Sequence, residues 1–132
     1  MSLLIDSSVW IDYFNGTNTP QTDHLHKILG SELIIVGDLI LAEVLQGFRL
    51  QKDFYQARIA LLKFPFVEML GKDIAIKSAE NYRHLRARGI TIRRTIDCLI
   101  ATCCLESNFT LLHSDRDFDP FEKYLGLQVR HP

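Results

Sequence analysis

The sequence predicts an α/β fold, a three-layer α/β/α sandwich with a mainly parallel sheet. Short apolar segments of strand length alternate with longer segments in which apolar residues recur every three or four positions. This alternation is typical of parallel strands that are joined by covering helices. The short segments are almost continuously apolar, as expected for strands that are buried on both faces of the sheet.

The first half of the chain is predicted to contain two strands and four helices. A strand over residues 2–6 precedes helices over 8–15 and about 21–30, the second of which Gly30 ends. A strand over 33–36 leads to a helix from Asp38 to about Leu50, for which Gly37-Asp38 offers an N-cap. Another helix covers about 53–63, and Pro65 ends it.

The second half is predicted to add three strands. A strand over 66–69 precedes a long helix over about 72–87, and a helix over 95–107 leads to a strand over 109–112. A short helical turn around 117–124 and a strand over 127–130 follow. Because no repeat, low-complexity tract or linker interrupts the 132 residues, we expect 1–132 to form a single domain.

The composition narrows the possible classes of function. A net charge of −1 excludes a strongly basic protein that holds nucleic acid by bulk charge, although it allows a local basic patch. Apolar runs are too short to span a bilayer, and the first residues lack the basic region of a signal peptide. Cys98, Cys103 and Cys104 share one predicted helix, which suits reduced packing residues. We therefore expect a cytoplasmic protein without a membrane segment.

Four carboxylates occur at strand ends or within apolar helical segments. Asp6 and Asp115 follow predicted strands, whereas Glu43 and Asp97 lie among apolar helical residues. Burial of an unpaired charge is costly, and ligands of parallel sheets bind beyond the carboxyl ends of the strands. Taken singly, Asp6 and Asp97 could be helix N-caps and Asp115 part of a solvated turn. Taken together, they predict a site for Mg²⁺ or Mn²⁺, which prefer oxygen ligands.

The segments around these acids resemble the motifs of PIN-domain nucleases, specifically the VapC-type toxin ribonucleases of toxin–antitoxin pairs. The resemblance covers nearly the whole chain through LIDSSVWID (4–12), LAEVLQG (41–47), TIDCLIA (95–101) and LLHSDRDF (111–118). It implies a PIN-like fold and an Mg²⁺- or Mn²⁺-dependent endoribonuclease. By motif position, the implied catalytic residues are Asp6, Glu43, Asp97 and Asp115.

The chemistry of metal-assisted phosphodiester hydrolysis suggests roles within this quartet. Asp6, Asp97 and Asp115 are the expected metal ligands, and Glu43 is expected to orient the attacking water or to coordinate the cation through a water. Asp117 is an additional candidate ligand, and the resemblance leaves open whether Asp115 or Asp117 is the fourth acid. Ser8 occupies the family's small-hydroxyl position, where it could steady a ligand or a water.

The expected binding partners are RNA, a small cognate antitoxin protein and a second copy of the chain. Arg93 and Arg94 end an arginine-rich segment over 83–94 and are candidate phosphate ligands, although a solvated helix end is the alternative. Trp10 and Tyr13 could stack bases, but core or interface packing is the more frequent role. The helices over 38–50 and 53–63 are candidate protein-contact surfaces.

Three other functions deserve comparison with this interpretation. Haloacid dehalogenase phosphatases need an acid where Ser8 stands, and receiver domains need an acid pair that Asp6-Ser7 does not supply. The remaining alternative is a non-catalytic PIN-like module that binds metal or RNA. The completeness of the acidic quartet argues against that module.

Overall fold

A parallel four-stranded sheet in the order β3-β2-β1-β4 forms the centre of the computed structural model, which describes residues 2–132. Its strands are β1 (Leu3–Ile5), β2 (Ile34–Gly37), β3 (Phe66–Val67) and β4 (Thr110–Leu112). In the register, Leu3 lies opposite Ile34 on one side and opposite Thr110 on the other. All residues of β1 and β4 are buried, which explains why their sequences are almost uniformly apolar.

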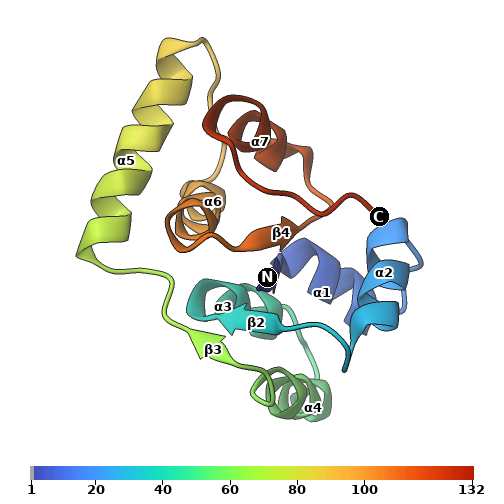
Figure 1. Ribbon diagram of the computed structural model, residues 1–132. Helices are drawn as coiled ribbons and strands as arrows, with labels where there is room; N and C mark the ends of the chain where they lie inside the picture. Colours follow the sequence, from blue (N-terminus) through green and yellow to red (C-terminus); the bar gives the residue numbers. More distant parts are fainter. Residues whose placement is uncertain (1) are drawn as a thin grey trace.

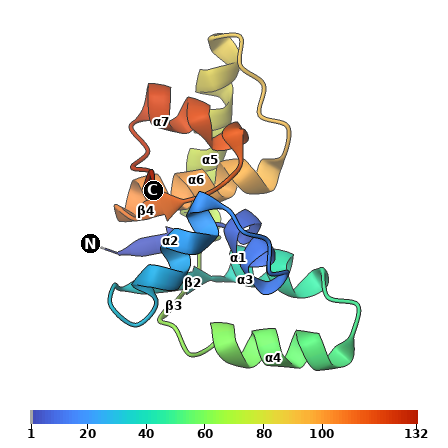
Figure 2. The same ribbon diagram turned by 90° about the vertical axis from the view of Figure 1, so that its right-hand side faces the viewer.

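Helices cover the sheet and confirm the predicted α/β/α class. They are α1 (Ser7–Phe14), α2 (Pro20–Ile28), α3 (Asp38–Gln46), α4 (Gln51–Leu61), α5 (Lys72–Ala87), α6 (Thr95–Ser107) and α7 (Asp119–Leu125), with a 3₁₀ turn η1 at Arg116–Phe118. Figure 1 shows α2 and α5 on opposite sides, with the sheet between them. Figure 2 shows α4 next to β3 and α7 above β4, at the two edges of the sheet. None of the helices in the described part of the chain is long and apolar enough to span a membrane.

Local sequence signals set the ends of several helices. Asp6 is the N-cap of α1, and its side chain accepts a hydrogen bond from the Ser8 backbone N–H. Thr19 caps α2 through a reciprocal capping box with Thr22. Helix α6 ends at Asn108, which has a left-handed backbone with φ of 56°. These contacts set where α1 and α2 begin and where α6, the helix that carries Asp97, ends.

The structure differs from the predicted elements in three places. The strand expected over 66–69 covers only Phe66–Val67. The helix expected to reach about Leu50 ends at Gln46, because Gly47 favours the end of a helix and the next helix starts only at Gln51. The strand expected over 127–130 is reduced to a single parallel bridge between Leu111 and Val129. Two backbone hydrogen bonds from Leu111 and Arg130 hold this segment beside β4.

The three cysteines are buried on α6, as predicted for packing residues. They form no disulfide with one another, and burial raises the pKa of the Cys104 thiol well above its usual range. A raised thiol pKa keeps this group neutral and unreactive at physiological pH.

Candidate metal centre

The parallel sheet brings the acidic segments together. Strands β1 and β4 are hydrogen-bonded neighbours, and Asp6 and Asp115 follow them at the same edge of the sheet. Helix α3, which carries Glu43, starts directly after the neighbouring strand β2. Asp97 lies in the first turn of α6. Four segments that are distant in sequence therefore supply carboxylates to one region.

Three of these carboxylates form a compact cluster. One oxygen atom from each of Asp97, Asp115 and Asp117 lies within 4.8 Å of the others. Asp97 is buried with 1% exposure, whereas Asp117 retains 17% exposure of its side chain. Asp115 accepts a hydrogen bond from the Asp117 backbone N–H at 2.9 Å, which fixes the two residues relative to each other. The structure thus places both Asp115 and Asp117 beside Asp97.

Asp6 is the second nearly inaccessible carboxylate of the site, with 3% exposure. Its Oδ2 atom accepts hydrogen bonds from the backbone N–H and the hydroxyl of Ser8. Its Oδ1 atom is buried and has no hydrogen-bond partner among residues 2–132. Burial raises the pKa of Asp6 to about 6, Ser8 opposes this shift, and repulsion by Glu43 and Asp97 adds to it. An unpartnered buried oxygen among repelling carboxylates fits a bound cation.

Glu43 is oriented by a serine that the sequence analysis did not single out. The Ser7 hydroxyl donates a hydrogen bond to Glu43 Oε1 at 2.7 Å, across 36 residues of sequence. The Glu43 side chain is 11% exposed. No local motif signals this contact, because it depends on how α1 and α3 pack against each other.

Both predicted phosphate ligands contact the acids directly. Arg94 binds both oxygens of Asp97, with Nε to Oδ2 at 3.0 Å and Nη2 to Oδ1 at 2.9 Å. Its Nη2 atom also lies 3.7 Å from Glu43 Oε2. Arg93 donates to Asp117 Oδ2 at 2.8 Å. The hydrogen bond to Asp97 raises the pKa of Arg94, so its guanidinium stays charged.

A pocket of about 480 Å³ opens over this cluster. Its lining consists of Ser7, Ser8, Ile11, Glu43, Gln46, Arg93, Arg94, Asp115 and Asp117. Carboxylate oxygens suited to a hard divalent cation therefore share one cavity with two guanidinium groups suited to a phosphate.

The family model described as the PIN domain matches residues 3–124. The chain belongs to the PIN-domain family. It is similar to VapC ribonuclease Mb1587 of Mycobacterium bovis and to ribonuclease VapC11 of Mycobacterium tuberculosis. Each is 30% identical over 132 residues, covering 96% of this chain and 96% of the relative.

Solved structures share the fold of this PIN domain. A chain of VapBC2 from Rickettsia felis, bound to a DNA fragment from its promoter, matches with a TM-score of 0.78 and 17% identity, covering 98% of each chain. FitAcB from Neisseria gonorrhoeae matches with a TM-score of 0.77 and 16% identity, covering 98% of this chain and 97% of that one. At such low identity the likeness confirms the architecture alone.

His113 supports the backbone of the PIN-domain site. Its Nδ1 atom accepts a hydrogen bond from the Asp115 backbone N–H at 3.2 Å, and its ring packs on Phe118. Burial lowers the pKa of His113, so the imidazole is neutral at physiological pH. The neutral ring can accept this bond, which helps to place the chain between Asp115 and Asp117.

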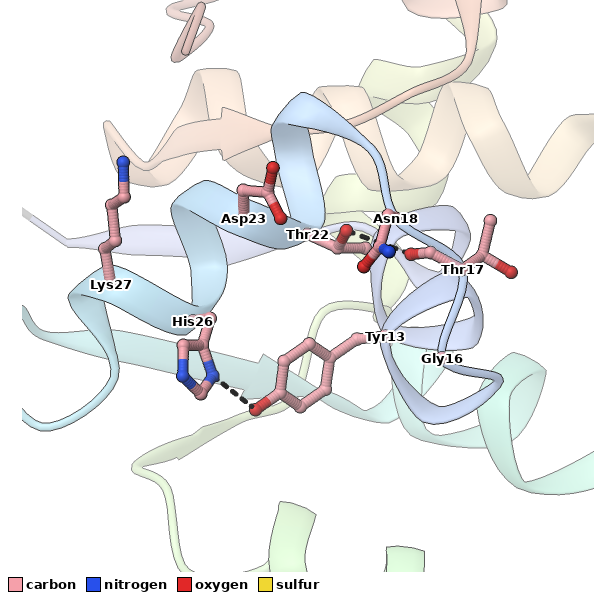
Figure 3. Close-up of a pocket in the computed structure, with 8 residues that line it drawn as sticks. All are labelled: Tyr13, Gly16, Thr17, Asn18, Thr22, Asp23, His26 and Lys27. Carbon is pink, nitrogen blue, oxygen red and sulfur yellow. Dashed lines mark hydrogen bonds between the residues drawn. The ribbon is translucent and has the colours of Figure 1, made fainter.

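The aromatic residues of α1 lie away from the acidic pocket. Trp10 is 2% exposed and packs against Phe14 and Phe64, so it belongs to the core and is not a base-stacking surface. Tyr13 lines a separate pocket of about 360 Å³ between the end of α1 and α2. Figure 3 shows the Tyr13 hydroxyl facing His26 Nδ1, at 3.4 Å. This second pocket contains none of the predicted metal ligands.

Proposed function

We propose that this PIN domain is a divalent-cation-dependent endoribonuclease and the toxin of a toxin–antitoxin pair. The main support is the cluster of Asp97, Asp115 and Asp117. A second support is the buried, unpartnered oxygen of Asp6, a carboxylate that lies outside this three-residue cluster but is repelled by Glu43 and Asp97. The names of the two mycobacterial relatives, both ribonucleases, support the reaction class. The family match over 3–124 supports the proposal that residues 1–132 act as one nuclease domain.

The donor set fits Mg²⁺ or Mn²⁺, and we assign Asp6, Asp97 and Asp115 as the residues that hold the cation. We assign Asp117 as a candidate further ligand, which its position within 4.8 Å of Asp97 and Asp115 supports. Ser8 keeps Asp6 Oδ2 engaged and leaves Oδ1 free among the described residues. A divalent cation at such a site lowers the pKa of water and stabilises the charge that develops on a phosphodiester.

We assign the remaining side chains of the pocket to the water and the substrate. Glu43, held by Ser7, is the residue that orients the attacking water and accepts its proton. Arg93 and Arg94 line the same pocket and are assigned to the phosphates of the RNA. These contacts give affinity without sequence selectivity, because every RNA carries the same phosphates.

A cleavage assay on purified protein tests this function. We expect the wild-type protein to cut a labelled single-stranded RNA with Mg²⁺ or Mn²⁺ and to stop when EDTA is added. Asp97→Asn should lower the rate by more than about 100-fold, because it weakens a ligand of the cation. Glu80→Gln, which makes the same acid-to-amide change at an exposed position of α5, is the matched control.

Two results of this assay would contradict the proposal. The first is cleavage that persists unchanged in EDTA. The second is an Asp97→Asn variant that cuts RNA as fast as Glu80→Gln. Cation binding without any cleavage would instead favour a non-catalytic PIN-like module.

We further propose that a small cognate antitoxin binds this chain in the cytoplasm and that the chain forms a homodimer. The printed names of the solved neighbours support the antitoxin, because they include VapBC assemblies and a toxin–antitoxin complex from Klebsiella pneumoniae. Helix α4 offers exposed apolar side chains for such contacts, including Tyr55 and Ile59. Phe48 on the preceding segment is partly buried against the core and is less available.

A further inference from the structure

Arg94 occupies the acidic site as a permanent positive charge. It engages both oxygens of Asp97, at 3.0 and 2.9 Å, and reaches to 3.7 Å from Glu43. Asp97 also belongs to the three-carboxylate cluster with Asp115 and Asp117. One carboxylate therefore serves two purposes, as partner of an internal guanidinium and as part of the candidate cation site.

A guanidinium and a divalent cation compete for Asp97. Mg²⁺ takes carboxylate oxygens as ligands at about 2.1 Å, and each Asp97 oxygen accepts one hydrogen bond from Arg94. Because each oxygen keeps a second lone pair, the competition is one of charge and not of occupied ligand positions. Two positive charges at neighbouring oxygens also repel each other, and the nearly inaccessible surroundings of Asp97 screen this repulsion only weakly. Cation binding at Asp97 must weaken the contact with Arg94.

The two partners differ in their freedom to move. Asp97 is 1% exposed and fixed in the first turn of α6, whereas the Arg94 side chain is 54% exposed. Arg94 can therefore rotate toward solvent, but Asp97 cannot leave the site. A buried carboxylate without a counter-charge is costly, so Arg94 stabilises the fold when no cation is bound.

We propose that Arg94 is an internal counter-ion of the metal site, which pairs with Asp97 and Glu43 until a divalent cation binds and displaces its guanidinium. This inference rests on the proposed function, because it assumes a cation at Asp97. It assigns a second role to Arg94: the displaced guanidinium lies at the pocket that we assign to RNA phosphates. Loading of the cation and exposure of this phosphate ligand are then coupled.

A Mn²⁺ titration followed by EPR tests the competition without using activity. Arg94→Gln removes the charge and should bind Mn²⁺ at least about fivefold more tightly than the wild type, within the usual range of coupling between two sites. Its thermal midpoint in EDTA should be lower than that of the wild type, because Asp97 loses its partner. Arg94→Lys keeps the charge but loses the two-point contact, so its Mn²⁺ affinity should be intermediate.

Arg130→Gln is the matched control for the loss of an arginine. Arg130 also contacts a carboxylate through two hydrogen bonds, to Glu32, but it does not line the acidic pocket. The Mn²⁺ affinity of Arg130→Gln should equal that of the wild type. Equal affinity of Arg94→Gln and wild type would overturn the inference while leaving the proposed function intact. A wild-type protein that binds no Mn²⁺ would overturn both.

A second measurement uses the unmodified protein and does not depend on the folding of a variant. The Arg94 Nε–H signal in ¹⁵N NMR should report the hydrogen bond to Asp97 in EDTA. At saturating Mg²⁺ this signal should shift and exchange faster with water. An unchanged Arg94 signal at saturating Mg²⁺ would show that the cation does not displace the guanidinium and would overturn the inference.

Discussion

Asp6 shows how one side chain connects the stability of the fold to the chemistry of the site. Its carboxylate is almost fully buried, and one oxygen has no hydrogen-bond partner in the described part of the chain. Burial raises its pKa from 3.8 to about 6, so ionised Asp6 is a cost to the folded protein at neutral pH. A bound cation offsets this cost, and for that reason we expect cation binding to raise stability.

Asp6→Asn should stabilise the protein in EDTA at pH 7. Each pKa unit corresponds to about 1.4 kcal/mol, so a rise from 3.8 to about 6 corresponds to a cost of about 3 kcal/mol. The amide removes the charge and keeps an oxygen that can accept the bonds from Ser8. We therefore expect an increase of about 1–3 kcal/mol in the free energy of unfolding, measured with urea.

The pH dependence of stability shows the direction in which ionisation of Asp6 acts. Below pH 3.8 Asp6 is protonated in both states, and between pH 3.8 and about 6 only the unfolded state ionises. The contribution of Asp6 to wild-type stability therefore falls as pH rises through this window, whereas Asp6→Asn lacks this fall. The free energies of unfolding of the wild type and Asp6→Asn should therefore not run parallel with pH. Parallel curves, or an Asp6→Asn variant less stable than the wild type at pH 7, would contradict the raised pKa of Asp6. Glu80→Gln controls for loss of an exposed carboxylate.

Sequence reasoning located the acids but not their hydrogen-bond partners. An acid that directly follows a strand is expected to lie near the acids that follow the neighbouring strands, because parallel strands end at one edge of the sheet. The contact of Ser7 with Glu43 depends on packing between α1 and α3, which no spacing reveals. The contact of Arg94 with Asp97 has the three-residue spacing of a helical ion pair and was detectable in principle. The catalytic roles of these residues stay predictions.

At the scale of elements, the junction of β2 and α3 sets the direction of the helix that carries Glu43. Gly37 ends β2, and the Met69 side chain lies against it so closely that a Cβ atom would be 2.1 Å from Met69 Sδ. Asp38 Oδ1 accepts a hydrogen bond from the Met69 backbone N–H at 2.7 Å. The glycine and this bond together hold the segment after β3 against the start of α3.

Gly37→Ala should destabilise the protein by about 1–3 kcal/mol, because the added methyl group overpacks the contact with Met69. Gly47→Ala is the matched control at the end of α3. Its φ of −80° suits alanine, and the nearest atom to an added Cβ would be 3.6 Å away. Its effect should be neutral or stabilising by up to about 1 kcal/mol. Equal urea midpoints for the two variants would contradict this account of the junction.

Apolar periodicity predicted most elements well because buried strands and amphipathic helices leave regular patterns. It failed where a boundary depends on one residue or on long-range pairing. The helix predicted to about Leu50 stops before Gly47, and residues 127–130 pair with β4 at one position only. Strand propensity alone does not specify how many residues of a terminal segment find a partner.

For the whole molecule, α4 and its C-cap residue carry a row of exposed apolar side chains. Tyr55, Ile59 and Leu62 recur at helical spacing and are 47%, 60% and 50% exposed. Exposed apolar groups in one row are typical of a protein-contact surface. The fold class was predictable from the alternation of elements, and the helix over 53–63 was a candidate contact surface from the sequence. Which face of α4 the core leaves uncovered was not predictable, because it depends on packing.

Ile59→Asp should weaken binding of the antitoxin by more than about tenfold, because a charge would be buried in an apolar contact. Isothermal titration with the proposed antitoxin would measure the effect. Ile76→Asp, at a residue of similar exposure on α5, is the control. Undiminished binding by Ile59→Asp would exclude this stripe as the contact. Light scattering would show whether the same change alters a homodimer instead.

We propose that folding unites carboxylates from distant segments into one cation site, and a Mn²⁺ titration of the amide variants tests this proposal most directly. We expect the wild type to bind Mn²⁺, and Asp6→Asn and Asp97→Asn each to weaken binding by at least about tenfold. Asp6 follows β1, and Asp97 lies in the first turn of α6. Weaker Mn²⁺ binding by both variants would therefore indicate that residues of two separate elements hold the same ion. Unchanged Mn²⁺ affinity in both variants would contradict the metal centre.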